Sequence, residues 1–197
     1  MTRTTVIGVT GVIVLAATAL VLLLLGTTAT GSPAGGELAQ ISNEGQPVDL
    51  GNGQQQELQN VGAIAASRIA TRAGRVFYQL LRPDGTVCYA VDLAGGDHLG
   101  NTSCPEPGAA FPTPTNPVLD FTIFESTSHV PGDFQIVSAQ GFAADGVKSV
   151  AIVDRNGRVI ARERTTANVY AVDVPAGRSA ASVVAYDAKH AEVYRTP

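Results

Sequence analysis

The pattern of hydrophobic positions divides the chain into an apolar N-terminal run and a later series of short alternating segments. The run from Val6 to Leu25 contains no charged residue and is as long as a helix that spans a bilayer core, which needs roughly 20 residues. Arg3 precedes it, and basic residues tend to stay in the cytoplasm. The run therefore predicts a single-pass transmembrane helix in residues 1–30, a cell-membrane location and an extracytoplasmic C-terminus.

The same run also fits a cleaved signal peptide. Its densest apolar part, Val12 to Leu25, is close to the roughly 7–15 residues of a signal hydrophobic region. Small residues follow at Thr27–Ala29 and at Ser32–Ala34, and they suit a signal peptidase. Secretion after cleavage is therefore the alternative to a membrane anchor.

Two later segments are predicted to be linkers. Residues 31–60 are rich in Gly and Gln and offer little apolar surface, so we expect loosely attached backbone there. Residues 105–117 contain closely spaced prolines, which break regular elements and stiffen the chain. This connector is the predicted boundary between two β regions, although a long crossover within one sandwich fits it equally well.

Residues 61–104 form the first of these β regions. Strands are expected at 75–81 and 86–91, on either side of the turn Pro83-Asp84-Gly85, in which Pro presets the backbone and Gly accepts a positive φ. The segment predicts a small antiparallel meander. A short helix over 57–70 is the competing interpretation, because apolar residues recur there at helical spacing.

Residues 118–197 form the second β region. Short apolar segments recur at intervals of roughly 10 residues, which is typical of an antiparallel sandwich. Asn156-Gly157, between two apolar segments, is a strong hairpin signal. The fold class predicted for the whole chain is thus mainly β, with a transmembrane helix, a meander and a sandwich. Strands are expected at 119–124, 134–137, 147–153, 158–164, 168–174, 181–186 and 191–194.

Motifs in this second region resemble those of a known fold. Asp154-x-Asn156-Gly157, Val174-Pro175-Ala176-Gly177 and the run from Val183 to Ala188 resemble the closing strands of bacterial immunoglobulin-like domains. The chain has no Trp, and both cysteines precede this region, so the antibody hallmarks are missing. The whole chain also resembles uncharacterised membrane-anchored proteins of high-GC Gram-positive bacteria. The resemblance implies an immunoglobulin-like sandwich and brings no activity with it.

Charge narrows the choice of partners. The net charge is −4 at pH 7, and the nearest approach to a basic run, from Arg158 to Arg164, is interrupted by Glu163. Mild acidity argues against nucleic acid and anionic lipid as partners. The expected partners are the lipid bilayer, through residues 6–25, and an envelope protein or a polysaccharide.

Cys88 and Cys104 are the two cysteines of the chain. An even, small number of cysteines outside the cytoplasm favours a disulfide, and closing such a loop stabilises a fold by about 3 kcal/mol on chain-entropy arguments. Free or intermolecular thiols are the alternative. A metal site would need His98 as a third ligand, in a spacing that matches no known zinc pattern.

The sequence has no recognisable catalytic motif. It lacks the G-x-S-x-G nucleophile elbow and paired-histidine metal motifs, so we predict no catalytic residue, no metal site and no cofactor. Glycoside hydrolysis needs two carboxylates. Four acids are candidates for it by residue type alone: Asp120, Glu125, Asp145 and Asp154.

The predicted function follows from the fold class. Sandwiches present binding residues in loops on a rigid scaffold, and the loops to consider are 92–103 and 126–133. We expect a non-catalytic binding or structural module of the cell envelope. The alternatives are an envelope hydrolase, or a ligand sensor that acts through another membrane protein. The candidate binding residues are Asp97, His98, Asn101, His129 and Asp133.

Overall fold

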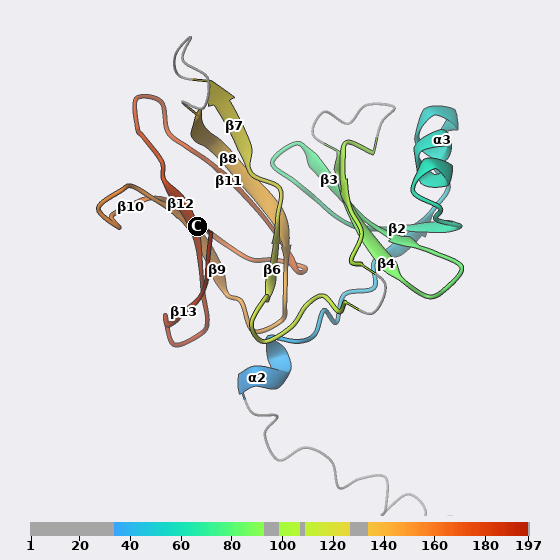
Figure 1. Ribbon diagram of the computed structural model, residues 1–197, viewed down its shortest axis with the longest axis horizontal. Coiled ribbons are helices and arrows are strands. Elements are labelled where there is room, and N and C mark those ends of the chain that lie inside the picture. The colour runs from blue at the N-terminus through green and yellow to red at the C-terminus, as the bar shows by residue number, and fades with distance from the viewer. Residues whose placement is uncertain (1–33, 93–98, 107–108, 127–133, 197) are drawn as a thin grey trace, which may run out of the picture. The chain divides into compact units, whose positions relative to one another are not determined.

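Antiparallel sheets dominate the computed structural model, which describes residues 34–92, 99–106, 109–126 and 134–196 (Figure 1). Every strand pair within these residues is antiparallel. The mainly β character predicted from the alternating pattern is confirmed. The boundaries predicted between linker, meander, connector and sandwich stay predictions.

The predicted fold class also included an N-terminal transmembrane helix, and this part needs correction. No helix among the described residues is long and apolar enough to cross a membrane. The longer of the two described helices, α3 (Asn52–Asn60), has 9 residues. It rises about 13 Å at 1.5 Å per residue, less than half of a hydrocarbon core of about 30 Å. The span predicted over residues 6–25 lies outside the described residues.

The first sheet follows the chain order, β1-β2-β3-β4-β5, and tight turns explain this simple topology. Ala73 and Gly74, between β2 and β3, both have positive φ, at 48° and 73°, as in the turns that suit a two-residue hairpin. Asp84 accepts a hydrogen bond from the Thr86 backbone at 2.9 Å in the next turn. The predicted meander is therefore present. Its strands are β1 (Gln46–Val48), β2 (Ala65–Arg72), β3 (Arg75–Leu81), β4 (Val87–Asp92) and β5 (Asn101–Ser103).

The polar stretch up to residue 60, predicted to be a linker, is more ordered than predicted. It contains α2 (Ala34–Glu37), β1 and α3. Leu58 of α3 is 3% exposed and packs in one cluster with Leu80 and Ala90 of the sheet. A single well-placed apolar residue thus anchors a helix that is otherwise polar. The competing prediction of a helix over 57–70 was wrong beyond Asn60, because β2 begins at Ala65.

The C-terminal region is the predicted β-sandwich. One sheet has the order β11-β8-β6, with β7 also paired to β8, and the other has the order β10-β9-β12-β13. Apolar residues of both sheets form one buried cluster that includes Val150, Ile152, Val172 and Val183. The strands are β6 (Val118–Asp120), β7 (Ile123–Ser126), β8 (Phe134–Ala143), β9 (Ser149–Val153), β10 (Val159–Arg164), β11 (Val169–Asp173), β12 (Ser182–Tyr186) and β13 (Glu192–Arg195).

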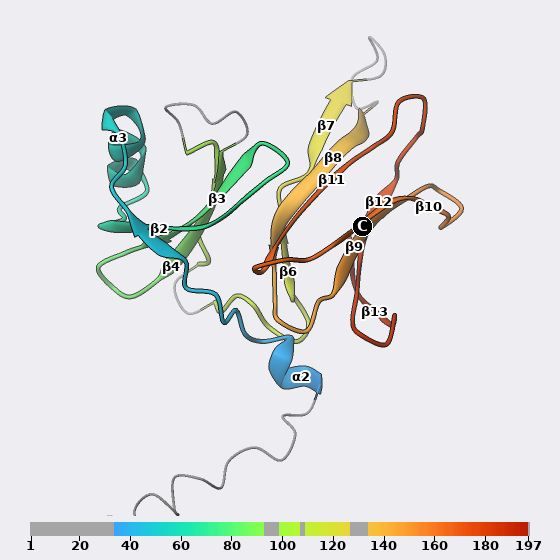
Figure 2. The ribbon, with the colours of Figure 1, turned by 180° about the vertical axis from the view of Figure 1, so that it is seen from behind.

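The sheet built on β8 packs on both of its faces. Its second face lies against the meander, as Figure 2 shows from behind. Phe142 of β8 is fully buried, and its ring centroid lies 5.6 Å from that of Phe77 and 4.8 Å from that of Tyr89. Two ion pairs flank this apolar contact, Arg72–Glu163 at 3.0 Å and Arg75–Asp173 at 2.5 Å. Meander and sandwich therefore share a core.

The N-terminal segment 37–43 is fastened to one end of the sandwich, at the turn between β8 and β9. Asp145 in that turn donates its backbone N–H to Gln40 at 2.8 Å, and its carboxylate accepts hydrogen bonds from Ser42. Asn43 donates to the Ala167 carbonyl at 3.0 Å. The opposite end of the sandwich, where β9 leads into β10, is not covered by this segment.

Candidate functional site

A disulfide fixes the edge of the meander, as predicted from the two cysteines. Cys88 in β4 bonds to Cys104, with a Cα–Cα distance of 4.2 Å. Cys88 is fully buried. Because Cys104 directly follows β5, the bridge holds this short edge strand against β4 in addition to the strand's own backbone pairing.

A hollow of about 650 Å³ lies between this edge strand and the sandwich. One wall is β5, and the other is formed by residues of β6, β7 and β8 and of the segment between β6 and β7, with Ala181 and Thr196 beside them. We call it the β5–β7 hollow, defined by Asn101, Thr102 and Ser103 on one side and by Asp120, Thr122 and Phe124 on the other. Meander and sandwich each supply one wall, so the cavity depends on the packing of the two.

Asp120 is the acidic residue of the β5–β7 hollow. The buried hydroxyl of Tyr170 donates to its Oδ1 at 2.5 Å, and the Thr122 hydroxyl donates to its Oδ2. Burial raises the pKa of the Asp120 carboxyl above its ordinary value, while the hydrogen bonds from Thr122 and Tyr170 partly offset this effect. Burial and the nearby Asp120 charge also raise the pKa of Tyr170 well above its ordinary value, which keeps this hydroxyl a donor.

The facing wall offers polar groups that are free to bind. Asn101, Thr102 and Ser103 line the hollow, and none of their side chains is hydrogen-bonded within the described part of the chain. An amide and two hydroxyls can each donate and accept. Opposite them, the Phe124 side chain is 56% exposed, an apolar surface beside a polar one.

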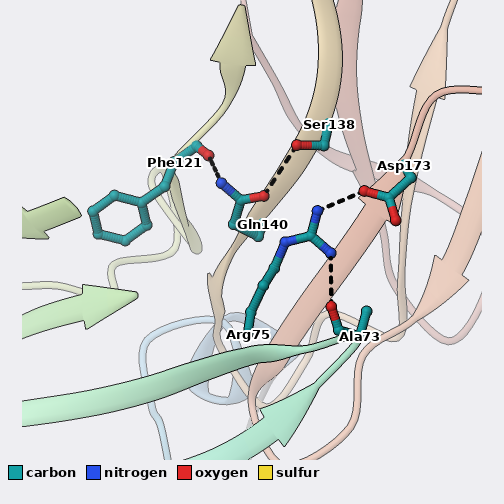
Figure 3. Close-up of polar contacts among 6 residues, drawn as sticks. All are labelled: Ala73, Arg75, Phe121, Ser138, Gln140 and Asp173. Carbon is teal, nitrogen blue, oxygen red and sulfur yellow. Dashed lines mark hydrogen bonds and ion pairs between the residues drawn. The ribbon is translucent and has the colours of Figure 1, made fainter. Parts of the chain in front are cut away.

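A buried polar cluster holds the segment that links β6 to β7 (Figure 3). Gln140 of β8 is fully buried and donates from Nε2 to the Phe121 carbonyl at 2.5 Å, while Ser138 donates to its Oε1 at 3.3 Å. The Phe121 backbone N–H returns a bond to the Gln140 carbonyl at 2.8 Å. Phe121 lies between Asp120 and Thr122, so these hydrogen bonds fix the backbone that carries both side chains.

Figure 3 also shows the ion pair between Arg75 and Asp173, the register partner of Ser138. The Arg75 side chain is only 11% exposed, and it donates to Asp173 at 2.5 Å and to the Ala73 carbonyl at 3.3 Å. Its charge is therefore neutralised at the contact between β3 and β11. This ion pair is a structural feature of the contact, since Asp173 and Arg75 do not line the β5–β7 hollow.

The structure places one of the predicted binding residues at this hollow, Asn101. The other four, Asp97, His98, His129 and Asp133, lie outside the described residues. Sequence reasoning named Asp120 by residue type alone and missed Phe124. The one sequence signal was the alternation of apolar and polar residues from Leu119 to Phe124. It places Asp120 on the polar side of a strand, but it does not indicate that Tyr170 lies next to Asp120.

This arrangement is suited to binding. Hydroxyl, amide and carboxylate groups can hydrogen-bond a polar ligand, and Phe124 can cover an apolar face of it. Within the described ranges, no group of three or more His, Cys, Asp or Glu side chains is placed to hold a metal ion. Comparisons of the chain with protein family models, curated proteins and solved structures give no match.

Proposed function

We propose that the protein is a non-catalytic binding module that acts outside the cytoplasm and holds a hydroxyl-rich ligand, a polysaccharide of the cell envelope, in the β5–β7 hollow. The observation on which this rests is Asp120, a largely buried carboxylate in an open hollow, opposite the polar edge strand β5, whose side chains have no hydrogen-bond partner in the described chain. Meander and sandwich act as a rigid frame for these groups.

The chemistry of the walls favours a ligand rich in hydroxyl groups. A carboxylate has about four lone-pair sites, and Tyr170 and Thr122 use two of those on Asp120. The remaining sites can accept hydrogen bonds from ligand hydroxyls, which also lessens the penalty of burying the charge. The exposed Phe124 ring supports contact with the apolar face of a sugar ring.

Two further points belong to this proposal. The disulfide supports a location in an oxidising compartment, outside the cytoplasm. The strand orders β11-β8-β6 and β10-β9-β12-β13 support an immunoglobulin-like sandwich, because a seven-strand domain of that kind also divides consecutive strands between two packed sheets.

The hydrolase alternative has less support at this hollow. Glycoside hydrolysis canonically uses two carboxylates, about 5–9.5 Å apart, on either side of the scissile bond. Among the described lining residues, Asp120 is the one carboxylate, and both of its oxygens already accept hydrogen bonds. Such an Asp120 is better suited to hold a hydroxyl than to transfer a proton to a leaving group.

The test is a titration of the oxidised full chain with neutral oligosaccharides, namely chitohexaose, cellohexaose and maltohexaose, followed by amide chemical shifts or calorimetry. Binding of at least one of them is expected. Phe124→Ala should weaken it about threefold to tenfold, the effect of losing roughly 0.5–1.5 kcal/mol of aromatic contact. Val159→Ala is the matched control, because Val159 is similarly exposed, at 45%, and does not line the hollow.

Three outcomes would contradict the proposal. If none of the oligosaccharides binds, or if both variants weaken binding equally, the hollow is not a saccharide site. If mass spectrometry finds cleaved oligosaccharide, the module is catalytic. Intact mass after alkylation of native protein without reductant tests the location: two alkylated cysteines would remove the argument for an oxidising compartment.

A further inference from the structure

A second hollow lies at the free end of the sandwich. It is formed by the β9–β10 turn and the β11–β12 loop, and it has a volume of about 390 Å³. The backbone N–H of Ala181 donates to Val153 at 2.8 Å, so the two connections are joined where the strands end. This is the end opposite to the β8–β9 turn, to which the N-terminal segment 37–43 is fastened.

Arginines dominate this second hollow. Arg155 and Arg178 line it together with Asn156 and Ser179, and Arg158 follows in the same turn. All three arginines are exposed, and none of their side chains has a hydrogen-bond or ion-pair partner in the described part of the chain. Four other arginines are engaged: Arg72, Arg75 and Arg195 form ion pairs, and Arg162 stacks over Tyr186.

The one carboxylate that lines this hollow has a structural role. Oδ1 of Asp154 accepts the backbone N–H of Asn156 at 2.8 Å and that of Arg158 at 2.9 Å. It closes the turn and is aimed at the backbone. Since no side-chain bond joins it to Arg155 or Arg178, both guanidinium groups keep their donors available.

Both connections are tight turns, so the backbone that carries the two arginines is fixed. Gly157 and Gly177 have φ of 76° and 75°, in the region that only glycine adopts readily. Arg178 itself donates its backbone N–H to Pro175 at 3.2 Å in a turn. A ligand would therefore meet two guanidinium groups on defined turns, with less ordering of the backbone needed on binding.

We propose that this end of the sandwich is a binding site for phosphate oxyanions. Guanidinium groups bind phosphate through paired, charge-assisted hydrogen bonds, and Asn156 and Ser179 add neutral donors beside them. The phosphate belongs either to a phosphate-bearing envelope polymer or to a phospholipid headgroup. The net negative charge of the whole chain argues against anionic partners. A ligand, however, responds to the local electrostatic potential of the surface that it approaches.

The proposal does not rest on saccharide binding in the β5–β7 hollow, because the two hollows are lined by different residues. The sequence could not indicate it, because Arg155 and Arg178 are separated by two strands, β10 and β11. Their convergence comes from the fold, in which Ser182, just after the loop, pairs with Val153, just before the turn.

The experiment measures binding of the oxidised full chain to linear polyphosphate and to vesicles of phosphatidylcholine with phosphatidylglycerol, between about 50 and 200 mM salt. We expect binding that weakens steeply with salt. The double variant Arg155→Ala/Arg178→Ala should bind at least tenfold more weakly at low salt and lower the logarithmic salt slope by about 2, one unit for each lost phosphate contact. Binding to only one of the two probes identifies the source of the phosphate.

Matched controls separate this site from a general effect of charge. Arg164→Ala/Arg68→Ala removes the same charge from exposed or partly exposed strand positions outside this hollow, and it should change affinity less than twofold. Equal weakening by the two double variants would overturn the proposal. So would equally tight binding of polyglutamate, which offers carboxylates instead of phosphates, or no binding of either phosphate probe at low salt by a chain whose melting is normal.

Discussion

Tyr170 and Asp120 are hydrogen-bonded across β8, although they lie on the two strands that flank it. Gly141 of β8 is the register partner of both residues, and it makes the contact possible. A Cβ at Gly141 would lie 2.9 Å from the Tyr170 hydroxyl and 2.0 Å from the Leu119 carbonyl. One residue without a side chain thus lets a fully buried tyrosine reach the carboxylate of the β5–β7 hollow, 2.5 Å away.

Gly141→Ala should destabilise the protein by about 1–3 kcal/mol, the usual effect of overpacking a closed site. The added methyl must displace either the β6 backbone or the Tyr170 hydroxyl. Urea unfolding of the oxidised chain measures the change. Gly51→Ala is the control, because nothing lies within 4 Å of a Cβ at Gly51 and its φ is −62°. Equal stability of the two variants would show that the row Asp120–Gly141–Tyr170 is not tightly packed.

Asp120→Asn should give a stability difference that depends on pH. Burial raises the folded-state pKa of Asp120. Above the unfolded pKa of about 3.8, ionisation of this carboxyl therefore lowers the stability of the folded protein. This loss disappears once the carboxyl is protonated. Asn keeps an acceptor for Tyr170 without the charge. Relative to the wild type, the variant should therefore be more stable at about pH 7 than at about pH 3.5.

Urea unfolding of wild type and variant at both pH values measures this difference. Tyr170→Phe is a useful second variant, because it removes the donor that stabilises the Asp120 charge. The pKa of Asp120 should then rise further, and the pH-dependent penalty should grow. A stability difference that stays constant with pH would contradict the raised pKa.

The sequence predicted local structure better than it predicted long-range contacts. Turn residues and the alternation of apolar and polar positions located β3, β4 and the Asn156-Gly157 hairpin, because such elements are determined by residues close together in the sequence. The polar segment of α3 was misjudged, since its order depends on Leu58 packing against β3 and β4. A periodic pattern cannot reveal that one apolar residue has a distant pocket to fill.

The candidate site was even less accessible to sequence reasoning. Asn101 was found because it lies in the loop closed by the disulfide. Asp120, Tyr170 and Phe124 had no motif, and the hollow exists only because the meander packs against the sheet of β8. The same holds for Arg155 and Arg178, which approach each other through the β9–β12 pairing.

Reduction of the disulfide should lower the melting temperature of the chain. Closing the loop between Cys88 and Cys104, 16 residues apart, is worth about 3 kcal/mol on chain-entropy arguments. For a chain of this size that corresponds to a fall of about 6–12 °C. Calorimetry with and without reductant measures it, and the double variant Cys88→Ser/Cys104→Ser should no longer respond to reductant. Identical melting of oxidised and reduced wild type would contradict the prediction.

Asp145→Asn should release the N-terminal segment 37–43 from the sandwich. The Asp145 carboxylate accepts the Ser42 backbone N–H at 3.0 Å, the Ser42 hydroxyl, and the Asn168 amide at 2.7 Å. Burial on its own raises the pKa of this carboxyl, but these bonds and the Lys148 charge outweigh it and leave the pKa below its ordinary value. Losing such charge-assisted bonds should destabilise the chain by about 1–3 kcal/mol at neutral pH.

The pH dependence of this loss has the opposite sign to that at Asp120. A lowered folded-state pKa gives stability that is present above the unfolded value of 3.8 and is lost as the pH falls through the folded value. The gap between wild type and Asp145→Asn should therefore be largest near neutral pH and shrink in acid. Asp187→Asn is the control, because among the described residues that carboxylate accepts hydrogen bonds only within its own turn, from the backbone N–H groups of Lys189 and Ala191. Hydrogen exchange should show faster exchange of the Ser42 amide in Asp145→Asn alone, and unchanged protection there would mean that other contacts hold the segment.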